Sequence, residues 1–223
     1  MSESATIVPL RGVRAMIAQK MVQSLGEAAQ LTHHGSADAT GLLARKSALA
    51  DAGTKVSVED ILMQVVVGTL RQHPDLNGTV TEKEIHLSRA VHLSVAMALP
   101  GNLLVAPAIF DAQDKSIEDL RAARQDLSAR AKANRLSASE MTKGTFSMSN
   151  LGLSRVHHFT PILNTPQIAI LGVGCADDRV VIEEGSPKSR PYIGLSLTFD
   201  HRAVDGAPAA AFLTDLINAI ETI

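Results

Sequence analysis

Hydrophobic and polar positions follow two different periods along this chain of 223 residues. In five segments, apolar residues recur at helical spacing or fill a long run, as in helices that pack on a core. These predicted helices cover residues 13–30, 41–52, 57–72, 116–132 and 207–223. Ser57 and Asp60 have the spacing of a capping box, and the residues after them are almost all apolar. We therefore expect the helix 57–72 to be deeply buried.

Apolar runs and alternating segments predict the strands. They cover residues 31–39, 91–99, 103–109, 145–149, 167–173, 180–182 and 192–199, with two short strands in 76–87 around a turn at Asn77 and Gly78. No repeat, low-complexity segment or linker divides the chain. The pattern predicts one α/β domain over residues 1–223, in which helices pack on a mixed β-sheet and about residues 1–10 form an extended arm.

A dense polar cluster follows the last predicted strand. Apolar and polar residues alternate from 195 to 200, and His201, Arg202 and Asp205 come before the next helix. A histidine at a strand end, beside acidic side chains, is well placed to move protons. The alternative is an ordinary loop histidine, which is the commoner role of an isolated one.

Composition excludes several classes of function. The chain carries 21 Lys and Arg against 23 Asp and Glu, a balance that argues against general nucleic-acid binding. Cys175 is the only cysteine, so no internal disulfide can form, and a small buried apolar role is expected. No targeting signal is present and no apolar run reaches about 18 residues. We expect a soluble, cytoplasmic protein without a membrane segment.

Two histidine pairs, His33–His34 and His157–His158, do not predict a metal site. Neighbouring residues on a strand point to opposite faces of the sheet. The Cys, His and Asp spacing of a typical metal site does not accompany either pair. We therefore predict no metal site.

Several ordered blocks resemble the catalytic domains of the dihydrolipoamide acyltransferases, the core components of 2-oxoacid dehydrogenase complexes. The blocks are Pro9–Arg14 with Ile17–Met21, His73–Asn77, Asp114–Ser116, Gly144–Gly152, Phe159–Gln167 with Ala169–Gly172, and the His-x-x-x-Asp-Gly pattern of His201–Gly206. They span almost the whole chain at family-like spacing. The resemblance implies the fold of chloramphenicol acetyltransferase, a mixed β-sheet with helices packed on it.

The resemblance also implies transfer of an acyl group between coenzyme A and a dihydrolipoyl thiol. A thiol must lose its proton before it attacks a thioester, and His201 matches the general base of the family. Ser149 matches the donor to the oxyanion, and Asp205 matches a carboxylate that supports the histidine loop. The alternative for Ser149 is an ordinary hydroxyl at the end of a strand, and only the flanking residues favour the catalytic role.

Coenzyme A is expected as a substrate, with the lipoyl group carried on another domain or protein. The sequence has no glycine-rich phosphate loop, so side chains would have to bind the coenzyme A phosphates. Arg11, Arg14 and Lys20 are the candidates, and solvated surface charges are the alternative. No segment resembles a lipoyl domain or a peripheral-subunit-binding domain, so we expect an excised core or a free-standing catalytic subunit.

A homotrimer with its sites between subunits is a further implication of the resemblance. The implied partners are a lipoyl domain and the decarboxylase and dihydrolipoamide dehydrogenase components of the complex. Large cores in the family are held together by an apolar tail after the last helix. The chain stops at Ile223 without such a tail, so we expect assembly to end at the trimer.

Three functions remain open from the sequence. The first is an active acyltransferase, with acetyl preferred, as in a pyruvate dehydrogenase complex. The second is a non-catalytic scaffold of the same fold, although such relatives generally lack the histidine. The third is an acetyltransferase for small hydroxyl or amine compounds, which is not expected to carry both Ser-Asn-Leu-Gly and Asn-Thr-Pro-Gln. The segment Leu153–His158 departs from the glycine-containing turn of the family and leaves substrate preference open.

Overall fold

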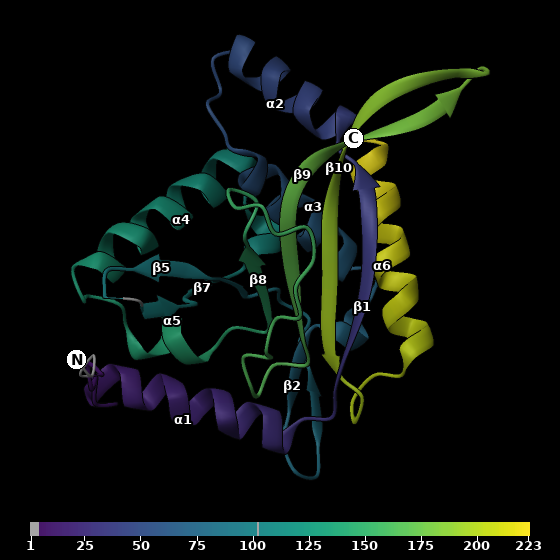
Figure 1. Ribbon diagram of the computed structural model, residues 1–223. Helices are drawn as coiled ribbons and strands as arrows, with labels where there is room; N and C mark the ends of the chain where they lie inside the picture. Colours follow the sequence, from purple (N-terminus) through teal and green to yellow (C-terminus); the bar gives the residue numbers. More distant parts are fainter. Residues whose placement is uncertain (1–4, 102) are drawn as a thin grey trace.

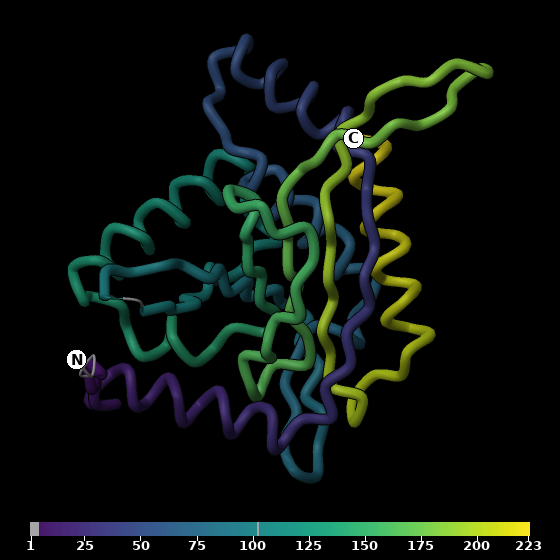
Figure 2. Tube along the Cα trace, in the orientation of Figure 1, coloured from purple at the N-terminus to yellow at the C-terminus, as the bar shows by residue number. Residues whose placement is uncertain are grey.

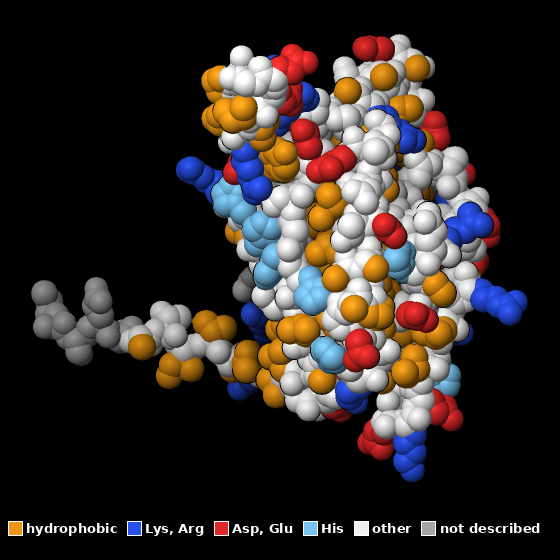
Figure 3. All heavy atoms as spheres, turned by 90° about the vertical axis from the view of Figure 1, so that its right-hand side faces the viewer, with side chains coloured by type: hydrophobic (Ala, Val, Ile, Leu, Met, Phe, Trp, Pro, Cys, Tyr) orange, Lys and Arg blue, Asp and Glu red, His pale blue; other side chains and the backbone are white. Residues whose placement is uncertain are grey.

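The computed structural model describes residues 5–101 and 103–223. The first four residues of the predicted arm lie outside the described residues. From residue 5 to residue 11 the chain is exposed and forms neither helix nor strand. Figure 3 shows this segment reaching away from the body of the protein with apolar side chains on it. Ile7 is 89% exposed, so it is not covered by any part of the chain that the structure describes.

A six-stranded mixed sheet forms the centre of the described fold, as the sequence predicted (Figure 1). In spatial order its strands are β1 (Gln30–Asp38), β10 (Ser186–Asp200), β9 (Ala169–Glu183), β8 (Phe146–Asn150), β4 (Leu93–Val95) and β7 (Ala108–Ile109). The pairs β9–β8 and β8–β4 are parallel, and the other pairs are antiparallel.

Helices occupy the predicted segments, with ends shifted by a few residues. They are α1 (Gly12–Glu27), α2 (Thr40–Asp51), α3 (Val58–Leu70), α4 (Ile117–Lys132) and α6 (Gly206–Glu221). The short helix α5 (Ala138–Thr142) and the 3₁₀ turns η1 (Pro74–Leu76) and η2 (Ala112–Asp114) lie outside the predicted helices. The capping box predicted for α3 is present: Ser57 Oγ accepts the backbone N–H of Asp60, and the Asp60 side chain accepts the N–H of Ser57. These reciprocal bonds satisfy free N–H groups and fix where the helix begins.

The main core lies where α3 and α6 pack against each other and cover one face of the sheet. The prediction that α3 is deeply buried is confirmed, since most of its side chains are inaccessible to solvent. Helix α1 differs, because Ser24 is its one buried residue. It lies at the bottom of the view in Figure 1, below α5 and away from α3 and α6.

Two short hairpins lie outside the main sheet and correct the predicted strands. The hairpins are β2 (Gly78–Val80) with β3 (Ile85–Leu87), and β5 (Met97–Leu99) with β6 (Leu103–Val105). The turn predicted at Asn77 and Gly78 is wrong, because the Asn77 amide instead donates to the carbonyls of Ser88 and Ala90. The strands predicted over 91–99 and 103–109 are each broken in two, since their outer parts join the small hairpin and their inner parts join the main sheet.

One long hairpin replaces the separate strands predicted over 167–173, 180–182 and 192–199. Strands β9 and β10 each run for 15 residues and meet at Glu184 and Gly185, both with positive φ. The turn of the hairpin is thus made by residues that take this left-handed conformation. The outer half of the hairpin projects beyond the sheet (Figure 2). Its alternating exposed and half-buried residues hid the continuity of the strand in the sequence.

Candidate active site

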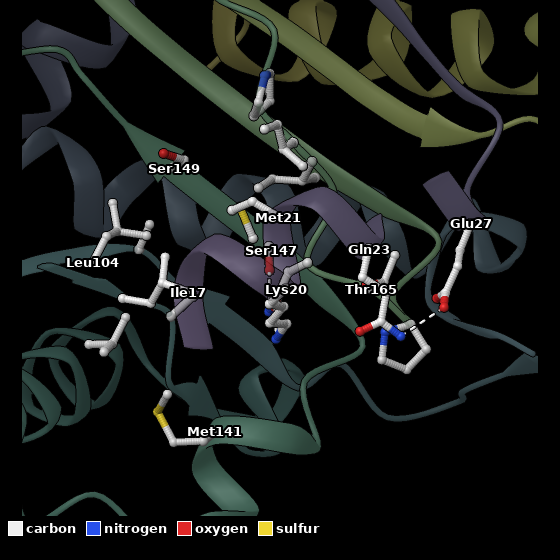
Figure 4. Close-up of a pocket in the computed structure, with 18 of the residues that line it drawn as sticks. Ile17, Lys20, Met21, Gln23, Glu27, Leu104, Met141, Ser147, Ser149 and Thr165 are labelled. Carbon is white, nitrogen blue, oxygen red and sulfur yellow. Dashed lines mark hydrogen bonds between the residues drawn. The ribbon is translucent and has the colours of Figure 1, made fainter. Parts of the chain in front are cut away.

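A cavity of about 910 Å³ opens between α1 and the sheet. Ser147 and Ser149 of β8 lie on one wall, and Ile17, Lys20 and Met21 of α1 lie on another (Figure 4). The loop of residues 159–166 forms a further wall, and Leu104, Met141 and Arg202 also line the cavity. A large and mostly apolar cavity with a few polar groups is a common form of substrate site.

Two hydrogen bonds hold α1 over this cavity. Ser24 Oγ donates to the carbonyl of Leu163 at 2.7 Å, and Lys20 Nζ donates to Asn164 Oδ1 at 2.6 Å. The rest of α1 keeps apolar side chains at the surface, among them Met16 at 69% and Val22 at 73% exposure. The helix is thus fastened to the cavity loop, while apolar side chains stay exposed both beside the cavity, at Met16, and elsewhere, at Val22.

Ser149 stands near the end of β8 and is one of the residues that line the cavity. The next residue, Asn150, fixes this strand end through hydrogen bonds to both the oxygen and the nitrogen of its side-chain amide. Its Oδ1 accepts the N–H of Gly152 at 2.7 Å, and its Nδ2 donates to Glu59 Oε1 at 3.3 Å. Glu59 is itself paired with Arg124 at 3.3 Å. The sequence placed Ser149 at a strand end, and the structure adds a cavity and a fixed backbone.

His201 begins the loop between β10 and α6. Its backbone N–H donates to the carbonyl of Ala29 at 2.9 Å, while its side chain is 43% exposed. The distance from His201 Nδ1 to Asp205 Oδ1 is 3.5 Å, long for a hydrogen bond but close enough for electrostatic attraction. Asp205 is the N-cap residue of α6, although its side chain does not accept a capping hydrogen bond.

A buried ion pair flanks the histidine in the sequence. The Asp200 side chain is almost inaccessible to solvent, and Arg202 donates Nε and Nη2 hydrogen bonds to it at 2.6 to 3.0 Å. The N–H of Ala29 also donates to Asp200 Oδ1 at 3.3 Å. Burial alone would raise the pKa of Asp200, but the hydrogen bonds from Arg202 outweigh it and lower the pKa. Asp200 and Arg202 thus fix the backbone on either side of His201, a role that sequence reasoning missed.

Ser149 and His201 do not meet within one chain. Ser149 is paired with Gly172 on β9, and Gly172 is paired with Ser196 on β10. His201 lies five residues after Ser196, beyond the end of β10. Two strand spacings amount to about 10 Å and four residues of strand to about 13 Å, so the two side chains are well out of contact.

Nor does the structure bring the three candidate phosphate ligands into one cluster. Arg11 and Arg14 are exposed at the start of α1, and Lys20 follows Arg14 by about 9 Å along the helix. The Lys20 ammonium points to Asn164 in the cavity. Desolvation by the surrounding protein lowers the pKa of Lys20, although the residue as a whole is exposed.

The histidines of the two pairs contact different residues. His33 contacts Phe199, while His34 donates to or accepts from Ser196 at 2.9 Å and stacks edge-on with His158. His157 lies 3.5 Å from the sulfur of Cys175, which is buried as expected. Among the described residues, no group of three or more His, Cys, Asp or Glu is arranged to hold a metal ion. None of the described helices is both long and apolar enough to cross a membrane.

Residues 2–223 match the family described as 2-oxoacid dehydrogenases acyltransferase (catalytic domain). The chain belongs to this family. It is 38% identical over 224 residues to the dihydrolipoyllysine-residue acetyltransferase component of the acetoin cleaving system of Bacillus subtilis. That alignment covers 98% of this chain and 56% of the relative, so the chain spans little more than half of that protein.

Solved structures confirm the predicted fold class. A probable dihydrolipoamide acetyltransferase from Listeria monocytogenes has a TM-score of 0.92 at 30% identity, covering 100% of this chain and 97% of that one. The dihydrolipoamide acetyltransferase of Azotobacter vinelandii has a TM-score of 0.89 at 29% identity, covering 98% and 92%. A chloramphenicol acetyltransferase, with a TM-score of 0.56 at 13% identity over 91% of this chain and 94% of that one, shares the fold alone.

Proposed function

We propose that this chain transfers an acetyl group between coenzyme A and a dihydrolipoyl thiol, as the catalytic part of a 2-oxoacid dehydrogenase type of complex. The observation that carries the proposal is the position of Ser149 on the wall of a cavity of about 910 Å³, in a chain of this family. The named relative from B. subtilis is itself an acetyltransferase component, which supports acetyl as the group.

The Azotobacter enzyme supports the choice of residues. A serine, a histidine and an asparagine have been investigated in its catalytic mechanism; the histidine stands 52 positions after the serine, and the asparagine four positions after the histidine. Ser149 and His201 have the same separation in this chain, and Asp205 stands at the third position. We therefore assign Ser149, His201 and Asp205 to the site, with a carboxylate where that enzyme has an amide.

In the proposed reaction, His201 takes the proton from the attacking thiol. The thiolate forms a new bond to the thioester carbon, and the carbonyl oxygen becomes an oxyanion. Ser149 donates a hydrogen bond to that oxyanion, which is worth most where charge develops. The intermediate collapses by breaking the old carbon–sulfur bond, and the departing thiolate receives the proton that His201 held. Asp205 attracts the imidazolium while it exists.

The distance between Ser149 and His201 supports a site built from two subunits. A homotrimer would place the histidine of one chain opposite the cavity of the next, as the resemblance implies. The exposed apolar side chains of α1 support the same assembly, because large exposed apolar areas are rare on monomers. Its exposed residues are Val13, Met16, Val22 and Leu25, at 53%, 69%, 73% and 57%. A lipoyl domain, a decarboxylase and a dihydrolipoamide dehydrogenase complete the proposed set of partners.

Acyl transfer by the purified chain tests the proposal. We expect acetyl-coenzyme A and dihydrolipoamide to give free coenzyme A and S-acetyldihydrolipoamide, with slower rates from succinyl- and isobutyryl-coenzyme A. Chloramphenicol as acceptor provides the comparison with a small-molecule acetyltransferase. A folded protein that binds coenzyme A but transfers no acyl group would be a scaffold, and transfer to chloramphenicol in preference to dihydrolipoamide would also refute the proposal.

A further inference from the structure

Lys20 places a cation in the cavity without an ionic partner. Its ammonium donates one hydrogen bond, to the neutral amide of Asn164, and forms no ion pair with a carboxylate in the part of the chain that the structure describes. An ammonium has three N–H donors, so two remain for another acceptor. Desolvation by the surrounding protein, which lowers the pKa of Lys20, strengthens whatever hydrogen bond such an acceptor makes.

Asn164 is held in place by a series of polar side chains that are hydrogen-bonded to one another. Asn164 lies 3.5 Å from Ser147 Oγ, which donates to Gln167 Oε1 at 2.6 Å, and Gln167 Nε2 donates to Ser94 Oγ at 3.2 Å. Any side chain at Gly144 would collide with Ser94 and Gln167, so the backbone there has to be glycine. Polar side chains that are hydrogen-bonded to one another in this way restrict each other's movement. They hold Asn164, and through it the Lys20 ammonium, at a fixed place on the cavity wall.

The position of this group relative to Ser149 limits what it can bind. Ser147 and Ser149 line the same cavity and are two residues apart on β8, a repeat of about 6.6 Å. With an acyl carbonyl at Ser149, a ligand atom at Lys20 lies about one strand repeat or more away. An acetyl group has no second polar atom to reach it. Because Asn164 lies 3.5 Å from Ser147 and 2.6 Å from Lys20, the ammonium stays in the same part of the cavity as Ser147. The coenzyme A phosphates stand farther off, at the other end of the pantetheine arm.

We propose that Lys20, held by Asn164, binds an amide carbonyl of the thiol-bearing arm of a substrate. Both arms carry such a group: pantetheine has an amide two carbons from its sulfur, and the lipoyl arm ends in an amide after its methylene chain. The inference rests on the proposed acyl transfer and adds a subsite to it. It gives Lys20 a different role from that of Arg11 and Arg14 at the start of the helix.

Paired substrates with and without the amide test this subsite in Lys20→Met. Dihydrolipoamide is compared with propane-1,3-dithiol as acceptor, and acetyl-coenzyme A with S-ethyl thioacetate as donor, each with the other substrate saturating. We expect KM to rise about tenfold or more for the amide-bearing member of one pair, since hydrogen bonds to charged groups are strong. KM for its amide-free partner should not change, and kcat should stay within about twofold. The pair that responds identifies which arm Lys20 holds.

Two further variants complete the experiment. Lys20→Arg keeps a cationic donor and should restore most of the preference for the amide. Lys46→Met removes an exposed lysine on α2 and should change nothing.

Other outcomes overturn the inference. Equal rises in KM for amide-bearing and amide-free substrates would show that Lys20 only fastens α1. A loss confined to succinyl-coenzyme A would assign Lys20 to an acyl carboxylate instead. Either result leaves the acyltransferase function standing, whereas a wild-type protein that transfers no acyl group to any thiol would refute both.

Discussion

Arg202 donates hydrogen bonds from Nε and Nη2 to the buried carboxylate of Asp200, and the backbone N–H of Arg202 donates to the same carboxylate at 3.0 Å. The residue between them is His201. Its backbone N–H is held by Ala29, so the histidine leaves the sheet from a segment that is fixed on both sides. The imidazole itself stays exposed. A base that contacts a substrate or a neighbouring chain has to be accessible in this way.

Asp200→Asn should lower the free energy of unfolding at pH 7 by about 2 kcal/mol, since breaking a buried pair is costly but Arg202 is partly solvated. The folded state lowers the pKa of Asp200. Its stabilisation is therefore complete above the unfolded pKa of about 3.9 and declines as pH falls through the folded value. Urea unfolding at pH 7 and pH 3 should show the difference between wild type and variant shrinking in acid. A difference that is the same at both pH values would contradict this role of the charge.

His201→Ala should lower turnover with dihydrolipoamide by about 10²- to 10⁴-fold, the usual contribution of a general base. The side chain is exposed in the single chain, so melting temperature and secondary structure should match the wild type. Steady-state rates with acetyl-coenzyme A, checked against circular dichroism, measure both effects. Near-normal turnover in a folded variant would show that His201 is not the base.

Ser149→Ala should lower kcat by about 10²-fold while KM changes little, because a bond to the oxyanion strengthens in the transition state. The Asn150 contacts to Gly152 and Glu59 do not involve the hydroxyl, so the strand end should keep its shape. Kinetics at several concentrations of each substrate separate the two constants. A change mainly in KM would indicate that Ser149 positions substrate.

Local sequence patterns predicted what depends on neighbouring residues. Ser57 and Asp60 predicted the start of α3, and the polar cluster at the end of β10 predicted where His201 would stand. Ser149 was predicted from its flanking residues and lies in the cavity. These features arise from helix capping, alternation and strand ends, all of which act within a few residues.

Long-range pairing decided what the sequence could not show. The separation of Ser149 from His201 follows from the order β8, β9, β10 and its register, which no local pattern encodes. Asn77 was predicted to make a turn, and instead its amide binds carbonyls more than ten residues away. The position of Lys20 depends on α1 crossing a loop that begins over a hundred residues later. Such contacts emerge only once the whole chain is packed.

The central claim is that one active site takes Ser149 from one chain and His201 from another. Ser149→Ala and His201→Ala, each inactive alone, are therefore mixed, dissociated, reassembled and assayed for acetyl transfer to dihydrolipoamide. With random assembly of a cyclic trimer, about a quarter of the interfaces receive both intact residues, so we expect about a quarter of wild-type activity. Native mass spectrometry on differently tagged chains verifies that the trimers are mixed. No recovery of activity in trimers shown to be mixed would contradict a site shared between subunits.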